Sequence, residues 1–143
     1  MSAGRGPGAI ERPPSSPFTE FIGGRFEEWS EDCVRISLVL EPHHTNPNGV
    51  MHGGVVTSLM DETLGHVIAA ARGLETMQLA PHSTVEMNAS FLAAARPGDR
   101  VVVEGRVLRL GKSIAFGEAE ARRGDGELIA KGRLTFAIHD RSG

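Results

Sequence analysis

The residues best suited to chemistry lie in one stretch in the middle of the sequence. Asn46 and His52 come just before the pair Gly53-Gly54, and Asp61 follows eight positions after Gly53. A carboxylate of this kind can serve as a nucleophile or as a general base. Two glycines in front of a long apolar run allow the chain to turn sharply into a helix.

The pattern predicts one long buried helix that begins near Gly53, because apolar residues dominate for nearly twenty positions without a proline. Asp61 would lie on the side opposite the main apolar face, beside small residues that let another surface approach. It is then either a solvated surface residue or a group that faces a partner and a ligand. Only Asp61 and Glu62 interrupt the apolar run, which favours the second interpretation. The residues predicted to face the chain's own sheet are Val55, Val56, Leu59, Met60, Thr63 and Val67, and the strip of mostly small residues beside Asp61 comprises Gly54, Thr57, Ser58, Gly65 and Ile68.

The rest of the chain is predicted to be mostly strand. A weak strand is expected within residues 21–29, and clearer alternation marks residues 34–40 and 85–91. Turns rich in glycine separate three further runs, at residues 101–110, 114–122 and 128–138. The order of strand, strand, long helix and four strands predicts an α+β domain in which one long helix packs against the concave face of a curved antiparallel sheet of five to six strands.

Length and composition limit the class of protein. At 143 residues the chain is expected to form one domain, residues 18–140, after a disordered tail, residues 1–17, that is rich in Gly, Pro and Ser. A net charge of −3 and a pI near 6.1 give no reason to expect nucleic acid. No apolar stretch is long enough for a membrane span or a signal peptide, and the single cysteine, Cys33, fits a reducing cytoplasm.

Three motifs occur along the chain in the same order as the expected elements. They are Asn46-Pro-Asn-Gly-Val-Met-His52-Gly-Gly with Asp61, then Thr84-Val-Glu-Met-Asn, and then Leu110-Gly-Lys-Ser-Ile-Ala-Phe. Together they resemble the hotdog-fold acyl-CoA thioesterases of the phenylacetyl-CoA and 4-hydroxybenzoyl-CoA (PaaI-like) type, over about residues 20 to 138. The resemblance implies a hotdog fold, hydrolysis of an aryl- or medium-chain acyl-CoA, and no cofactor apart from the coenzyme A of the substrate.

The resemblance also assigns roles to single residues. The backbone N–H of Gly53 would bind the thioester oxygen, and Asp61 would act as nucleophile or as general base on water. Asn46 would lie near the water, His52 would orient the thioester, and Thr84 would hold the attacking water. Each of the last three has a purely structural alternative, namely a turn asparagine, a loop histidine that satisfies backbone groups, and an ordinary strand threonine.

Further residues are expected to bind the substrate. By resemblance the hairpin Gly111-Lys112-Ser113 contacts coenzyme A, and Arg109 and Lys112 are available for its phosphates. A solvated hairpin tip is the structural alternative, and Arg96 is a weaker phosphate candidate. Gly54 is expected at the site beside Gly53. The acyl pocket is expected to include Val56, Met60, Leu64, Ile68 and residues 79–82.

Other functions compete with hydrolysis. A non-catalytic acyl-CoA-binding protein would use the same glycine and hairpin but would have no need for Asp61. A hotdog hydratase or dehydratase is less compatible, because its motif requires Asp and His where this chain has His44 and Gly49. A metal site built from histidines 43, 44 and 52 with Asp61 is chemically conceivable, but adjacent histidines seldom converge on one ion, so no metal is expected.

Helix geometry makes a prediction about assembly. Residues Gly53 and Asp61 would lie about 12 Å apart along one helix axis, at 1.5 Å per residue. One thioester carbonyl cannot contact both. If both act on the same substrate, Gly53 of one chain must meet Asp61 of another, which requires a homodimer with two antiparallel helices and composite active sites. From the resemblance alone, a dimer of dimers is also expected.

Overall fold

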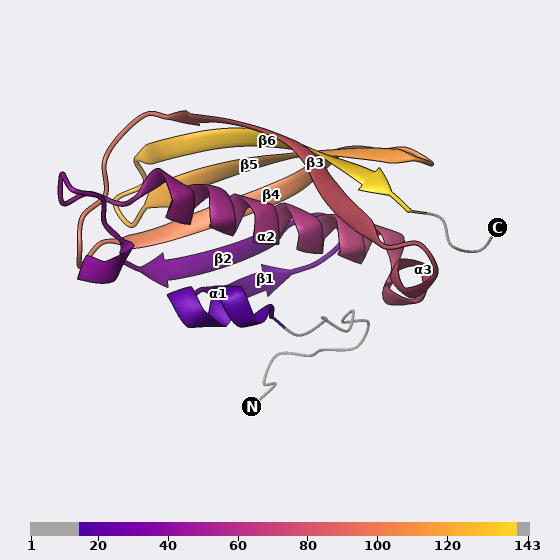
Figure 1. Ribbon diagram of the computed structural model, residues 1–143, viewed down its shortest axis with the longest axis horizontal. Coiled ribbons are helices and arrows are strands. Elements are labelled where there is room, and N and C mark those ends of the chain that lie inside the picture. Colours follow the sequence, from indigo (N-terminus) through magenta and orange to yellow (C-terminus); the bar gives the residue numbers. More distant parts are fainter. Residues whose placement is uncertain (1–14, 140–143) are drawn as a thin grey trace.

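The computed structural model describes residues 15–139, and it consists of a curved antiparallel sheet wrapped around one long helix (Figure 1). The predicted fold class is therefore confirmed. Within the described residues the sheet has six strands in the order β1-β2-β4-β5-β6-β3. The strands are β1 (Arg25–Trp29), β2 (Val34–Val39), β3 (His82–Phe91), β4 (Arg100–Leu110), β5 (Ile114–Arg123) and β6 (Leu128–Ile138).

The central helix α2 (Gly53–Arg72) begins where the sequence predicted. His52 caps it, because its side chain accepts a hydrogen bond from the N–H of Gly54 and so satisfies one of the free donors of the first turn. The helix ends before Gly73, whose φ of +85° suits glycine. A short 3₁₀ turn, η1 (Pro42–His44), and the loop that carries Asn46 lead into it.

Glycines in the middle of the sheet let α2 lie close to the strands. A Cβ atom added to Gly117 in β5 would lie 2.7 Å from Cδ2 of Leu64, and one added to Gly132 in β6 would lie 2.7 Å from Sδ of Met60. Both helix side chains are fully buried. The floor of the curved sheet is thus shaped to receive the large side chains of α2, which fixes the rotation of the helix and the direction in which its polar residues point.

The strand predicted over residues 21–29 is confirmed only for its second part. The segment Pro17–Ile22 forms a helix, α1, and the strand β1 starts only at Arg25. Ser16 caps α1 at its start, and Gly23 ends it with a φ of +90°. Most of the expected tail, residues 1–14, lies outside the described residues, as does Asp140 at the expected end of the domain.

A second unexpected helix, α3 (Leu74–Leu79), connects α2 to β3. Strand β3 follows as predicted, but it lies at the edge of the sheet and pairs only with β6. Its apolar side chains are exposed, with 61% of Val85, 38% of Met87 and 56% of Phe91 accessible. The alternation in this strand predicted a buried face, and within the described chain that face has no cover. None of the helices in residues 15–139 is long and apolar enough to span a membrane.

Candidate active site

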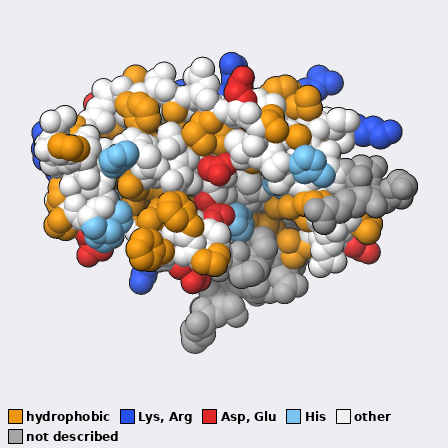
Figure 2. Space-filling view, in the orientation of Figure 1, with side chains coloured by type: hydrophobic (Ala, Val, Ile, Leu, Met, Phe, Trp, Pro, Cys, Tyr) orange, Lys and Arg blue, Asp and Glu red, His pale blue; other side chains and the backbone are white. Residues whose placement is uncertain are grey.

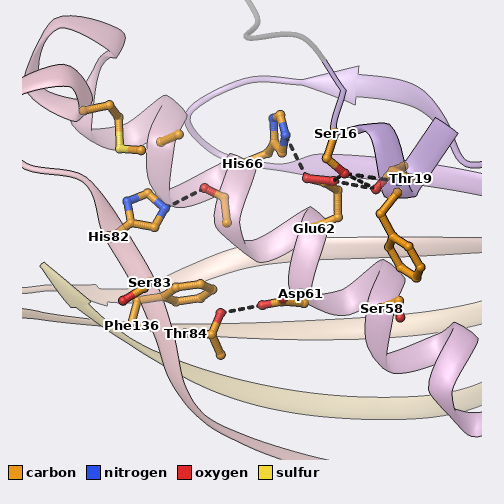
Figure 3. A pocket seen from close by; sticks show the side chains of 14 residues that line it. Ser16, Thr19, Ser58, Asp61, Glu62, His66, His82, Ser83, Thr84 and Phe136 are labelled. Atoms are coloured by element: carbon orange, nitrogen blue, oxygen red, sulfur yellow. Dashed lines mark hydrogen bonds and ion pairs between the residues drawn. The ribbon is translucent and has the colours of Figure 1, made fainter. Parts of the chain in front are cut away.

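Asp61 and Thr84 meet at the junction of the helix and the edge strand. The Thr84 hydroxyl donates a hydrogen bond of 2.5 Å to Oδ1 of Asp61, across 23 positions of sequence (Figure 3). A β-bulge between Thr84 and Glu86 shifts the register of β3 against β6 at this point. Both residues are partly exposed, so a substrate can reach the carboxylate.

A hollow of 630 Å³ opens beside this pair. It runs along α2 between α1 and the first residues of β3, and Figure 3 shows the side chains around it. The lining residues are Ser16, Phe18, Thr19, Ser58, Asp61, Glu62, Gly65, His66, Ala69, Met77, His82, Ser83, Thr84 and Phe136. We call this hollow the carboxylate chamber. Its volume is in the range of small-molecule sites.

Glu62 contributes a second carboxylate to the carboxylate chamber. It accepts hydrogen bonds from the hydroxyls of Ser16 and Thr19, and one of its oxygens lies 3.1 Å from Nε2 of His66. The hydrogen bond with His66, together with those from the two hydroxyls, lowers the pKa of Glu62 to about 2 in spite of its burial. No role for Glu62 or His66 was predicted from the sequence. Their spacing of four residues on one helix was the available signal.

His82 fixes the beginning of β3 against α2. One ring nitrogen, Nε2, lies 2.9 Å from the carbonyl oxygen of Gly65, and the other, Nδ1, accepts a hydrogen bond of 2.8 Å from Arg72. Since arginine can only donate, the ring is the neutral tautomer that carries its proton on Nε2. Burial lowers the pKa of His82, in agreement with this state. The contact holds the backbone two residues before Thr84.

Asn46 and Gly53 lie in a different hollow, of 460 Å³, which shares no lining residue with the carboxylate chamber. We call it the glycine hollow. The N–H of Gly53, at the first position of α2, has no acceptor within residues 15–139. A Cβ atom added there would lie 3.2 Å from the ring of Phe91, so glycine permits the close approach of β3. One protomer therefore keeps the predicted oxyanion donor apart from the predicted carboxylate.

The polar residues around the glycine hollow have structural tasks as well. Oδ1 of Asn46 accepts hydrogen bonds from the backbone N–H groups of Asn48 and Val50, at 2.9 and 3.4 Å, which leaves its amide NH₂ as the free donor. His52 uses Nδ1 to accept the Gly54 N–H at 2.8 Å. The structural alternatives considered for both residues are thus present. The Gly54 N–H is occupied and is not a second donor for a thioester.

The predicted coenzyme A hairpin joins β4 and β5. Arg109, Lys112 and Ser113 are exposed on it, and Gly111 is required because an added Cβ would lie 2.7 Å from the carbonyl oxygen of Ile114. In Figure 1 this hairpin lies at the end of the molecule where α2 finishes, opposite the end that carries Gly53. Arg96, also exposed, lies in the turn before β4, where its N–H bonds Asp99.

The predicted acyl-pocket residues of α2 require a correction. Met60, Leu64 and Ile68 have no accessible surface and pack in the core against the sheet, so a bound acyl group could not touch them without opening that core. The apolar face of α2 is wider than predicted, because the curved sheet wraps around the helix. The carboxylate chamber is lined instead by the neighbouring face, with Gly65 and Ala69.

Figure 2 shows the face of the molecule that carries α2, with acidic side chains near its middle and hydrophobic ones on both sides.

No group of three or more His, Cys, Asp or Glu side chains within residues 15–139 is arranged to hold a metal ion. His44, a candidate in the metal alternative, is buried and bonds the carbonyl oxygen of Ile22 at 2.7 Å. His52 serves as the cap of α2.

Known proteins are similar to this chain in sequence and in fold. The sequence model of the Thioesterase superfamily matches residues 48–130. Acyl-coenzyme A thioesterase 13 of Homo sapiens is 35% identical over 103 residues, which cover 71% of this chain and 70% of that protein. A conserved protein of Pseudomonas aeruginosa is 33% identical in a solved structure, with a TM-score of 0.78 over 86% of this chain and 94% of that one.

The crystal structure of zebrafish thioesterase superfamily member 2 is similar too, with 27% identity and a TM-score of 0.75 over 87% of this chain and 88% of that one. The family match includes Gly53 and Asp61 of α2 and extends through β5 into β6. The chain therefore belongs to the Thioesterase superfamily and is a thioester hydrolase with the hotdog fold.

Proposed function

We propose that this protein hydrolyses an acyl-CoA to the free acid and coenzyme A, with Asp61 as general base. The observation that carries the proposal is the hydrogen bond from Thr84 to Oδ1 of Asp61 at the wall of the carboxylate chamber. The hydroxyl orients the carboxylate and leaves Oδ2 for a water molecule. The human relative, named as an acyl-coenzyme A thioesterase, supports the choice of thioester.

The reaction follows from these positions. Asp61 removes a proton from the water, and the water oxygen attacks the carbonyl carbon of the thioester. The carbonyl oxygen gains negative charge, which the N–H of Gly53 stabilises at the positive end of α2. The tetrahedral intermediate then releases the coenzyme A thiolate, which takes up the proton that Asp61 removed from the water. Asn46 can donate its amide N–H to the same carbonyl oxygen or to another acceptor of the substrate.

The site needs two chains. Asp61 and Thr84 lie in the carboxylate chamber, whereas Gly53 and Asn46 lie in the glycine hollow about two turns away along α2. Two protomers with antiparallel α2 helices would place Gly53 of one beside Asp61 of the other. The same arrangement would bring the hairpin of Lys112 to the end of the partner that carries its Gly53. We therefore propose a homodimer with two composite sites and, from family resemblance, pairing of two such dimers.

A panel of acyl-CoA esters tests the proposed function. Release of the coenzyme A thiol is measured for aryl-acetyl, benzoyl, short, medium and long aliphatic esters. Turnover is expected for at least one class, with loss of more than about 1,000-fold in Asp61→Asn, because the amide cannot accept a proton. The variant should keep its fold by circular dichroism and bind the ester in calorimetry. Absence of turnover across the panel, or turnover by Asp61→Asn within about tenfold of the native enzyme, would contradict the proposal.

Isotope labelling separates a general base from a nucleophile. A single turnover in ¹⁸O-labelled water places the label in the released acid if water attacks the thioester directly. If Asp61 attacks first, an anhydride forms, and its hydrolysis at the Asp61 carbonyl leaves the label in the protein. Mass spectrometry of the peptide that contains Asp61 is expected to show no label. A labelled peptide would assign the nucleophilic role to this residue.

A further inference from the structure

The carboxylate chamber continues beyond Asp61 for about two turns of α2. Along this path it passes Glu62, Gly65, His66 and Ala69, while α1 covers one side and the start of β3 the other (Figure 3). A thioester whose carbonyl carbon lies at Asp61 has two arms, the acyl group and the coenzyme A. The chamber offers space for one of them.

The lining of the chamber excludes the coenzyme A arm. Among the described residues, the two carboxylates Asp61 and Glu62 line it, and no lysine or arginine does. The two histidines that line it, His66 and His82, already direct Nε2 at Glu62 and at a backbone carbonyl. These two carboxylates would repel the negatively charged phosphates of coenzyme A. The exposed cations of the β4–β5 hairpin lie outside the chamber, so the acyl arm is the one that enters.

Glu62 places a fixed negative charge beside that arm. Its side chain is only 15% exposed, and the hydroxyls of Ser16 and Thr19 together with His66 hold the ionised form. Nδ1 of His66 is buried and has no hydrogen-bond partner within the described residues, so the ring fits best as the neutral tautomer that donates Nε2–H to Glu62. Within residues 15–139, these four groups together then carry one negative charge, that of Glu62.

We propose that Glu62 determines acyl specificity by rejecting acyl groups that end in a carboxylate, so that the chamber accepts uncharged acyl groups. The inference rests on the proposed thioester hydrolysis at Asp61. An acyl chain of six carbons, with its carbonyl at Asp61, extends about one helical turn, far enough to bring a terminal carboxylate beside Glu62 and His66. Two carboxylates at that distance in a partly buried chamber repel each other strongly.

The first test needs no variant. Hydrolysis by the native enzyme is compared for hexanoyl-CoA, for adipoyl-CoA, and for the adipoyl ester whose far carboxylate is converted to a primary amide. The amide has nearly the same size as the carboxylate but no charge. The kcat/KM for adipoyl-CoA is expected to be at least about tenfold below that of the amide. Equal values for the two would overturn the proposal.

The second test changes the protein. Glu62→Gln keeps the size of the side chain and an oxygen that can accept from Ser16 and Thr19. It is expected to raise the kcat/KM ratio of adipoyl-CoA to hexanoyl-CoA by about tenfold. Glu20→Gln removes an exposed carboxylate of α1 that does not line the chamber, and as the matched control it should leave the ratio unchanged. An unchanged ratio in Glu62→Gln, or an equal change in Glu20→Gln, would refute the role of Glu62.

Binding separates this proposal from the proposed function. In the Asp61→Asn background, calorimetry compares the affinity for the adipoyl ester with that for its amide, with no turnover required. The amide is expected to bind about tenfold more tightly, and the added Glu62→Gln should remove the difference. Equal binding with Glu62 intact would refute the specificity role even if hydrolysis is found. Absence of hydrolysis together with this preference would contradict only the proposed catalysis.

Discussion

The hydroxyl of Thr84 occupies one oxygen of the Asp61 carboxylate, and this contact sets the direction in which the second oxygen points. A hydrogen bond to a charged group contributes on the order of 1.5–3 kcal/mol. The acyl group need not touch the hydroxyl of Thr84. Removal of this hydroxyl should therefore affect the chemical step more than substrate binding. The role assigned to Thr84 can therefore be separated from that of an ordinary strand threonine.

Thr84→Val retains the shape of the side chain and removes the hydroxyl. We expect kcat to fall by about 10- to 100-fold with KM nearly unchanged, measured by steady-state hydrolysis of the best ester in the panel. Ser83→Ala is the matched control, since the neighbouring hydroxyl bonds His139 and not the carboxylate. A loss of less than twofold in Thr84→Val would mean that Asp61 holds its position without this contact.

Glu62 should make stability depend on acid pH. Its folded-state pKa of about 2 lies below the ordinary value of 4.5, so the stabilisation is complete above pH 4.5 and is lost as the pH falls toward 2. Its contribution to the free energy of unfolding is at most about 3.5 kcal/mol, at about 1.4 kcal/mol per unit of pKa. The groups that face this carboxylate are Ser16, Thr19 and His66.

Urea unfolding at pH 7 and at pH 3 measures this contribution. We expect Glu62→Gln to lower the free energy of unfolding at pH 7 and to lose less stability than the native protein between the two pH values. Glu20→Gln, at an exposed position of α1, should behave as the native protein does. If the native protein and Glu62→Gln show the same change between pH 7 and pH 3, Glu62 does not hold α1 through its charge.

At the scale of elements, the β4–β5 hairpin tests how the substrate is oriented. Lys112 is exposed at its tip, and within residues 15–139 no acidic group pairs with it. A contact with a phosphate of coenzyme A would form before the transition state and persist in it, so its loss should appear in KM. The other lysine, Lys131, forms an ion pair with Glu118 at 2.8 Å on the outer face of the sheet.

Lys112→Ala is expected to raise KM for the coenzyme A ester by about five- to tenfold and to leave kcat unchanged. The same acyl group carried on pantetheine, which has no nucleotide, should show no such effect. Lys131→Ala removes the same charge from another part of the sheet. As the control, it should leave KM unchanged for both substrates. A KM increase that is equal for both substrates would place Lys112 away from the phosphates.

The elements that the sequence predicted well are those with a long, regular pattern. Twenty residues of α2 and the strands of the meander each repeat their period several times, and turns rich in glycine separate them. The helices α1 and α3 have six residues each, less than two turns, which is too short for a period to appear. Moreover, α1 is held by Glu62, a tertiary contact 43 to 46 positions away that no local pattern contains.

The residues of the candidate site also fall into those that the sequence predicted and those that it missed. Gly53 and Asp61 could be found because they lie in one motif, and the helical rise separates them by a calculable distance. Glu62 and His66 were missed because their partner Ser16 lies on α1, which the sequence did not predict. Met60 was assigned both to the face toward the sheet and to the acyl pocket, and in the structure it packs in the core against the sheet. The curved sheet covers more of the helix than a flat one would.

At the scale of the whole molecule, a single chain leaves a strand edge and apolar side chains near α2 exposed. The edge strand β3 has one side without a β partner within the described chain, and its apolar residues Val85, Met87 and Phe91 are exposed. The small residues beside Asp61 on α2 let another helix approach closely. Two chains related by a two-fold axis would cover these surfaces and join each carboxylate chamber to the partner's glycine hollow.

Two inactive variants should therefore restore one active site when they share a dimer. Asp61→Asn damages the carboxylate chamber. Gly53→Pro removes the oxyanion N–H at the first position of α2, where proline is tolerated, and the exposed ring of Phe91 can rotate away from it. Each variant alone should be inactive. Co-refolding in equal amounts gives about half heterodimers, each with one intact site, so about a quarter of native activity is expected, measured as thiol release after native mass spectrometry of the mixture.

The matched control for this experiment places both lesions in one chain. When the chain that carries Asp61→Asn together with Gly53→Pro is co-refolded with the native chain, each heterodimer has one lesion in each of its sites and should be inactive, because every site takes one residue from each chain. If each chain instead held its own complete site, those heterodimers would keep half of the native activity, and the two single variants would not complement each other. Activity that follows this second pattern, in mixtures shown to contain heterodimers, would refute the composite site and the assignment of Gly53 and Asp61 to one thioester.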